Sequence, residues 1–187
     1  MLDTMNHLGP KEIAQISAAS IYFVATAPLS AHGSVNLSPK GMRDTLAIVD
    51  DATIAYLDLT GSGAETAAHL AENGRITMMW CSFDESPNIL RVYGTGRAHR
   101  PGSHRFVELL ALFGPHLGVR GIVELRVHSV KNSCGFGVPV ALGMSEREDL
   151  DAWMERKGTE GLLDYQRRKN ALSIDGLPSW GDPGITI

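Results

Sequence analysis

Cysteine is scarce in this chain: its 187 residues include only Cys81 and Cys134, which lie far apart and form no CxxC motif. A disulfide framework is therefore not expected, and free thiols in a cytoplasmic protein are the simplest interpretation. The histidines His99, His104 and His116 belong to no HExxH motif or other metal-ligand spacing. The sequence therefore predicts no metal site.

Long hydrophobic runs and an excess of positive charge are also missing. No apolar run approaches the ~18–20 residues that cross a bilayer, and the first residues, MLDTMNHLGPKEIAQ, lack the basic and then apolar profile of a signal peptide. The formal net charge of −4 provides no chain-wide basic field for nucleic acid or an anionic membrane. No GxSxG motif and no Ser-His-Asp order is present. These absences exclude a membrane span, a nucleic-acid partner and a recognisable serine hydrolase.

The composition that remains, 43% hydrophobic and 20% charged residues, is that of an ordinary globular domain. Hydrophobic patterning and turn residues predict seven strands, at 21–27, 34–38, 45–49, 53–59, 75–83, 88–100 and 121–130. Helical patterns occur at 9–20, 64–73 and 104–113, and again in the tail at 150–158 and 161–171.

The order of these elements predicts a mainly β protein with helices, an α+β fold built as a mostly antiparallel barrel. We assign the barrel to residues 1–143 and a helical C-terminal extension of the same domain to residues 144–187. Gly74 suits a helix C-terminus, and Ser103 suits an N-cap. Ser145 and Glu148 match a capping box, which predicts a helix start in the extension.

The stretch YLDLTGSGAETAAHLAENGRI places Gly61 and Gly63 between an apolar strand and a helix. One interpretation is a tight connection in which the glycines supply positive φ and nothing binds. A second is a dinucleotide-binding fingerprint, but its sixth position is Thr66, and strands and helices do not alternate here as that fold requires. A third is a mononucleotide phosphate held beside a barrel, where the start of the helix offers free N–H groups.

A second stretch, VNLSPKG at residues 35–41, favours the third interpretation. Ser38 and Lys40 lie at the end of a predicted strand, where a hydroxyl and an ammonium could converge on a phosphate. Together the two stretches predict a mononucleotide site.

The ordered series FVATA, VNLSPKG, the glycine stretch and LRVYGTGRA, within Ile21–Val140, resembles the pyridoxamine 5′-phosphate oxidase-like flavoproteins, which are FMN-binding split barrels. The resemblance implies FMN as the cofactor, a homodimer with each flavin between two chains, and an oxidoreductase acting on a small-molecule redox substrate. In the vitamin B6 oxidase itself, an Arg and a Lys begin the helix after the loop. Glu65 and Thr66 occupy those positions here, which implies a different subgroup and transfers phosphate binding to Lys40, Ser38, loop amides or a partner chain.

The resemblance and the two stretches together define the predicted cofactor site as Asn36, Ser38, Lys40, Asp58, Leu59, Thr60, Gly61, Ser62, Gly63, Glu65, Thr66, His69, Cys134 and Gly135. Ser62 and Thr66 add hydroxyls, whereas the carboxylate of Glu65 would repel a phosphate and is expected to cap the helix or bind a ribityl hydroxyl. His69 either faces the ligand or is an ordinary helix residue.

Cys134 and Gly135 lie in the turn-rich stretch SCGFGVP, which is either a plain strand exit or a segment whose backbone contacts the flavin of the neighbouring subunit. No side chain stands out as a catalytic acid or base, so the substrate stays open. The alternative from another class is a non-catalytic protein that binds or senses a flavin, haem or the deazaflavin F420. A nicotinamide-dependent dehydrogenase that uses the glycine loop is a further alternative.

Overall fold

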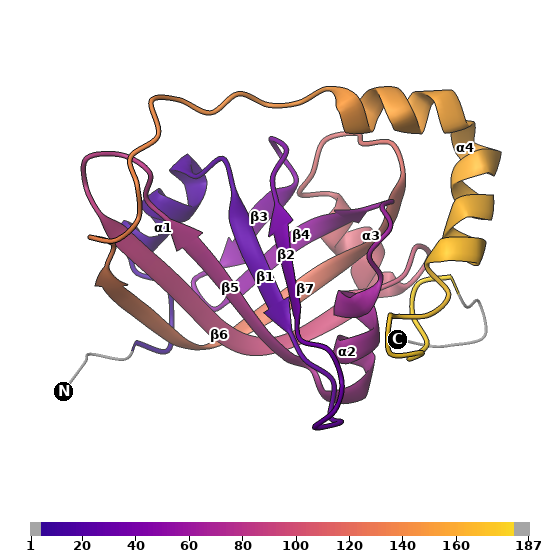
Figure 1. Ribbon diagram of the computed structural model, residues 1–187, viewed down its shortest axis with the longest axis horizontal. Helices are drawn as coiled ribbons and strands as arrows, with labels where there is room; N and C mark the ends of the chain where they lie inside the picture. Colours follow the sequence, from indigo (N-terminus) through magenta and orange to yellow (C-terminus); the bar gives the residue numbers. More distant parts are fainter. Residues whose placement is uncertain (1–4, 182–187) are drawn as a thin grey trace.

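The computed structural model describes residues 5–181, which form one seven-stranded sheet and four helices (Figure 1). The sheet has the order β2-β1-β5-β6-β7-β4-β3, and every pair of neighbouring strands is antiparallel. The strands are β1 Tyr22–Thr26, β2 Asn36–Lys40, β3 Leu46–Asp50, β4 Thr53–Leu59, β5 Arg75–Cys81, β6 Asn88–His99 and β7 Val119–Cys134. The predicted antiparallel α+β fold is confirmed.

The sheet curls so strongly that strands far apart in its order come together. Four strands separate β2 from β4 in the sheet, yet Lys40 at the end of β2 forms an ion pair with Asp58 near the end of β4. This closure makes the sheet a split barrel. It brings the two stretches that the sequence singled out to the same place.

The helices are α1 Pro10–Ala18, α2 Glu65–Asn73, α3 His104–Leu110 and α4 Asp149–Lys169. Two end signals are confirmed: Gly74 closes α2 with a φ of 70°, and the Ser103 hydroxyl accepts a hydrogen bond from Phe106 N at the start of α3. The predicted capping box at Ser145 is wrong. The helix begins only at Asp149, because the residues before it stay non-helical along the wall of a cavity.

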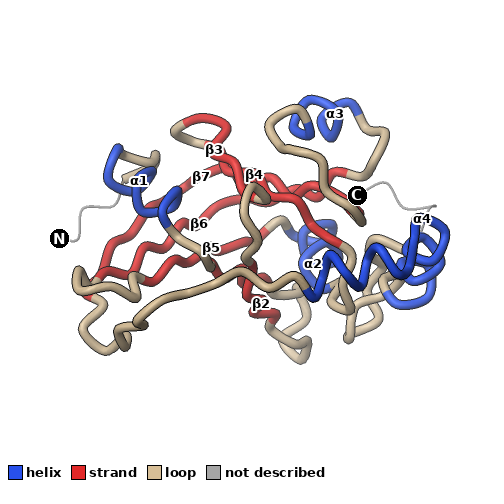
Figure 2. Tube along the Cα trace, turned by 90° about the horizontal axis from the view of Figure 1, so that it is seen from above, coloured by secondary structure: helices blue, strands red, loops and turns tan. Residues whose placement is uncertain are grey.

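The tail helix α4 consists of two helical segments joined at a kink, in agreement with the two segments that the sequence predicts. Gly158, with a φ of 62° and a ψ of 172°, interrupts the helical backbone of α4 (Figure 1). The segment between β7 and α4 crosses the molecule without regular structure, as the view from above shows (Figure 2). It is this segment that carries the chain from the end of the sheet to the cavity.

Strand β4 is buried on both faces, and two clusters explain why. Ile54 and Tyr56 belong to the main core inside the curled sheet. Ala55 and Leu57 point to the other face, where they form a second cluster with α3 residues such as Phe106. The strand that carries Asp58 is therefore held from both sides, which fixes the position of its end.

The chain after α4 returns to the sheet and is anchored there. Trp180 is buried in the main core and occupies the space above Gly121, where a Cβ atom would overlap the indole ring. Arg100 donates hydrogen bonds of 2.8 Å to the carbonyl oxygens of Ser179 and Trp180. The division at residue 143 stays a prediction, but Trp180 of the extension packs into the core of the barrel.

Candidate functional site

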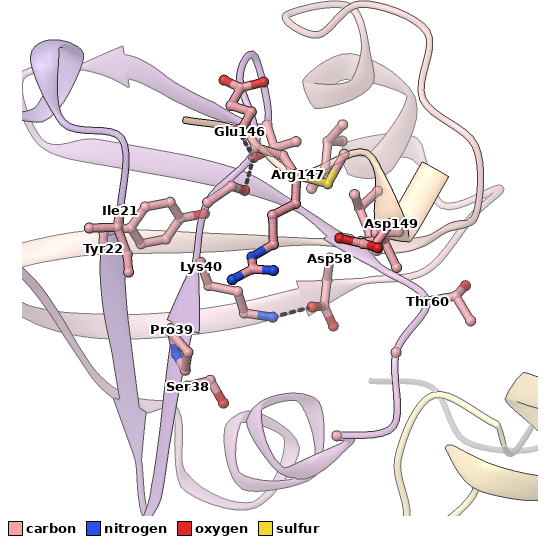
Figure 3. A pocket seen from close by; sticks show the side chains of 18 of the residues that line it. Ile21, Tyr22, Ser38, Pro39, Lys40, Asp58, Thr60, Glu146, Arg147 and Asp149 are labelled. Atoms are coloured by element: carbon pink, nitrogen blue, oxygen red, sulfur yellow. Dashed lines mark hydrogen bonds and ion pairs between the residues drawn. The ribbon is translucent and has the colours of Figure 1, made fainter. Parts of the chain in front are cut away.

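A cavity of about 1060 Å³ opens where β2 and β4 meet (Figure 3). Its wall consists of the ends of these strands, the loop that leads into α2, Arg120 on β7 and the residues just before and at the start of α4. Ten of the predicted site residues line it: Ser38, Lys40, Asp58, Leu59, Thr60, Gly61, Ser62, Gly63, Glu65 and Thr66.

The other four predicted residues do not line this cavity. Asn36 and His69 lie behind its wall and are described below. Cys134 and Gly135 lie at the far end of β7, beside Asn88 at the start of β6. Because they were assigned to the flavin of a neighbouring subunit, their role stays a prediction.

Asp58 is the electrostatic centre of the cavity wall. Its carboxylate, only 1% exposed, accepts hydrogen bonds from Lys40 Nζ at 2.8 Å and from Arg120 Nε at 3.1 Å. The indole Nε1 of Trp180 donates a third bond of 2.6 Å. Burial alone raises the pKa of Asp58, but Arg120 and Lys40 outweigh burial and hold that pKa well below its usual range.

Lys40 therefore enters the cavity already paired with a carboxylate. Its side chain is 23% exposed, and an ammonium has three donors, of which Asp58 occupies one. The other two N–H groups of Lys40 can still donate to a ligand, and the contact between Lys40 and a phosphate stays a prediction.

A chain of hydrogen-bonded side chains connects the cavity wall to the buried His69. The Ser38 hydroxyl donates to Asn36 Oδ1 at 2.8 Å, and Asn36 Nδ2 donates to the hydroxyls of Thr26 and Thr66 at 3.0 and 3.1 Å. The Thr26 hydroxyl lies 3.0 Å from His69 Nδ1. Asn36 and His69 thus support Ser38 and Thr66 from behind.

His69 is fully buried behind the cavity wall. Burial lowers the pKa of the imidazole, against the opposing influence of Asp175, Glu65 and Glu72. Its Nε2 atom has no hydrogen-bond partner among residues 5–181. The imidazole belongs to the polar network behind the wall, and the direct ligand contact that the sequence left open stays a prediction.

The glycine loop exposes its backbone to the cavity. Neither Gly61 nor Gly63 has a positive φ, so the expectation that these glycines supply a left-handed turn is wrong. A Cβ atom at Gly61 would meet nothing within 4 Å, and at Gly63 it would approach only the carboxylate of Glu65. Within the described part of the chain, the N–H groups of Ser62 and Gly63 make no hydrogen bond. The loop therefore holds two backbone N–H donors, those of Ser62 and Gly63, without a partner among the described residues.

The carboxylate of Glu65 lies between the loop and the C-terminal tail and contacts both. Its carboxylate accepts hydrogen bonds from Ala64 N at 3.0 Å and from Ile174 N at 3.2 Å. The Ser179 hydroxyl donates to the carbonyl of Ala64, and Asn170 Nδ2 donates to that of Gly61 at 2.8 Å. The tail thus holds the loop in place, and the two expected roles of Glu65, capping the helix or binding a ribityl hydroxyl, stay predictions.

Sequence patterns missed three residues of this site: Arg120, Arg147 and Trp180. Arg120 is only 7% exposed and also donates to the carbonyl of Gly61 at 3.2 Å. A charged residue between Gly118 and Gly121, just before the apolar residues Ile122 and Val123, was the available signal. Arg147 comes from the segment before α4 and points into the cavity towards Lys40 (Figure 3).

Two further features bear on what the site can hold. Among the described residues, no group of three or more His, Cys, Asp or Glu side chains could hold a metal ion. Within the same part of the chain, no helix has the length and hydrophobicity to cross a membrane.

Comparisons with known proteins agree with this architecture. The family model described as pyridoxamine 5′-phosphate oxidase matches residues 10–134. The pyridoxamine 5′-phosphate oxidase family protein ustO of Aspergillus flavus is 36% identical over 174 residues, covering 84% of this chain and 70% of that protein. Two crystal structures of HupZ from Group A Streptococcus share the fold, with TM-scores of 0.52 and 20% and 19% identity; they cover 67% and 73% of this chain and 99% and 100% of theirs. The chain belongs to the pyridoxamine 5′-phosphate oxidase family.

Proposed function

We propose that the cavity binds FMN and that the protein is an FMN-dependent oxidoreductase with a small-molecule redox substrate. The observation that carries the proposal is the bare backbone of Gly61 and Gly63 in the cavity wall, with free N–H groups at Ser62 and Gly63. Ser38 and Thr66 line the same cavity, with the Ser38 hydroxyl donating to Asn36 in the structure. A phosphate that carries about −1.5 to −2 charge is stabilised by such donors at the start of a helix.

The rest of the cavity suits a mononucleotide. Its volume of about 1060 Å³ lies at the upper end of the ~300–1,000 Å³ that small-molecule sites occupy. Tyr22, Pro39 and Leu57 add apolar surface for a flat ring, and the charged groups near Lys40 can pair with a polar edge. The antiparallel sheet does not have the doubly wound topology that a dinucleotide fingerprint requires. These features favour FMN over a nicotinamide dinucleotide.

We also infer that the protein is a homodimer with the flavin at the subunit interface. The strand β2 lies at one edge of the sheet, and Leu37 on this strand is 63% exposed. Val35, just before it, is 74% exposed. An apolar edge strand beside the cavity is a surface that a second copy of the chain could cover. In such a dimer Cys134 and Gly135 would contact the partner's flavin.

A second candidate function is binding of a flavin, haem or F420 without turnover. It is favoured by the state of two ionisable groups in the cavity wall, Asp58 and Tyr22, neither of which is suited to exchange a proton near neutral pH. Asp58 is held ionised by two cations, and burial raises the pKa of the Tyr22 hydroxyl, with Asp58 adding to the effect. Anaerobic reduction of the bound flavin followed by candidate acceptors would separate the two functions, because a carrier would reoxidise with none of them.

The cofactor itself can be identified directly. We expect protein purified from cells to show flavin absorption bands, and the released cofactor to have the mass of FMN. A Soret band or the mass of F420 would instead support another cofactor. A colourless protein that FMN fails to stabilise would contradict the proposal, and NAD serves as the matched control ligand.

A further inference from the structure

Most charged side chains that line the cavity are engaged, and among the described residues only Arg147 and the carboxylate of Asp149 make no hydrogen bond or ion pair. Lys40 and Arg120 share the carboxylate of Asp58, and Arg43 lies 3.2 Å from Glu146. Within residues 5–181, the guanidinium of Arg147 takes part in no hydrogen bond or ion pair. It nevertheless points into the cavity towards Lys40 (Figure 3). Two cations thus face the same space.

The loop side of the cavity offers no free cation, among the described residues, to balance a bound anion. At the start of α2 stand Glu65 and Thr66, and Glu65 is already engaged with Ala64 N and Ile174 N. Positive charge can reach this space from the opposite side, through the segment before α4 that carries Arg147. Because two nearby cations repel each other, an anion between Lys40 and Arg147 would stabilise both.

We infer that Arg147 binds an oxyanion in this cavity, so that the C-terminal extension completes the ligand site of the barrel. A guanidinium presents paired N–H donors that match the geometry of a phosphate or carboxylate, and such charge-assisted bonds are stronger than neutral ones. The identity of the ligand rests on the proposed function. The oxyanion is either the phosphate of the flavin itself or an acidic group on a second ligand beside it.

Calorimetric titrations of four proteins test this inference: the wild type, R147Q, R147K and the control R156Q. Arg156 is an exposed arginine on α4 that lies outside the cavity lining, so R156Q removes the same charge from the same extension. The ligands are FMN and riboflavin for the flavin-free chain, and then phenyl phosphate and benzoate for the FMN-loaded chain. We expect R147Q to lose roughly tenfold or more in affinity for an oxyanion-bearing ligand, R147K to lose less, and R156Q to match the wild type.

The pattern of losses identifies the source of the oxyanion. A loss for FMN without a loss for riboflavin would assign Arg147 to the flavin phosphate. Unchanged FMN binding with weaker binding of phenyl phosphate or benzoate would assign it to a second ligand.

Affinities of R147Q within about twofold of the wild type for all four ligands would overturn the inference. Failure of the wild type to bind FMN would contradict the proposed function instead. Phenyl phosphate binding to the flavin-free wild type and to flavin-free R147Q would then decide the role of Arg147. Weaker binding to R147Q would support the inference, and equal binding or no binding to both proteins would refute it.

Discussion

Replacing Asp58 by asparagine should destabilise the protein strongly, although the two side chains have nearly the same shape. The carboxylate accepts hydrogen bonds from Lys40, Arg120 and Trp180, at 2.8, 3.1 and 2.6 Å. Arg120 is almost as buried as Asp58 itself. Neutralising the aspartate would leave a buried guanidinium without its counter-charge.

The expected cost follows from comparison with other buried ion pairs. Removing one partner of such a pair costs about 3–5 kcal/mol, because the remaining charge stays desolvated. Since the amide oxygen of the asparagine could still accept one hydrogen bond, we expect D58N near the lower limit, about 3 kcal/mol. Trp180→Phe removes only one bond to the carboxylate and should cost about 1.5–3 kcal/mol.

Urea unfolding followed by tryptophan fluorescence measures these costs. With an m-value of ~2 kcal/mol/M, a loss of ~3 kcal/mol shifts the midpoint by about 1.5 M. Asp51→Asn is the matched control, because Asp51 is exposed and its side chain makes no hydrogen bond or ion pair among the described residues. A D58N midpoint indistinguishable from that of D51N would refute the argument that Asp58 holds the cavity wall together.

Four further outcomes are expected. The folded-state pKa of Asp58 is depressed, so its ionised carboxylate adds to the free energy of unfolding above the unfolded pKa near ~3.9. This stabilisation is lost as the pH falls towards the folded-state pKa. When the free energy of unfolding is measured against pH, D58N should lack this acid-dependent loss. Saturating FMN at about a hundredfold excess over its dissociation constant should add ~2.7 kcal/mol of stability, measurable by thermal unfolding, whereas NAD should add none. Lys40→Ala should weaken FMN much more than riboflavin in fluorescence titrations; equal losses would mean that Lys40 does not touch the phosphate. Pyridoxamine 5′-phosphate should not be oxidised, because Glu65 and Thr66 replace cations at the start of α2; turnover at roughly 1 per second or faster in an oxygen-consumption assay would contradict this.

Local sequence signals predicted most of the fold. Hydrophobic patterning and the turn residues between segments located all seven strands, because both signals can be read without tertiary information. Gly74 and Ser103 marked helix ends because their chemistry acts within one turn. Ser145 failed as a start signal because nearby residues contribute to the cavity wall, a tertiary demand that outweighs local capping.

The site could be predicted only where its residues are neighbours in the sequence. The stretches with Ser38 and Gly61 were recognised because each is a continuous motif. Asp58 instead depends on Arg120, 62 residues away, and on Trp180, 122 residues away. Neither partner belongs to a periodic pattern, so only the closure of the sheet and the return of the tail reveal them. Arg147 escaped prediction for the same reason.

A crystal structure of the protein with FMN would test the central claim most directly. The account predicts the phosphate oxygens within hydrogen-bonding distance, about 2.7–3.2 Å, of the N–H groups of Ser62 and Gly63, with the ring in the cavity between β2 and β4. FMN bound with its phosphate away from the glycine loop, or a cavity that stays empty at saturating FMN, would contradict it.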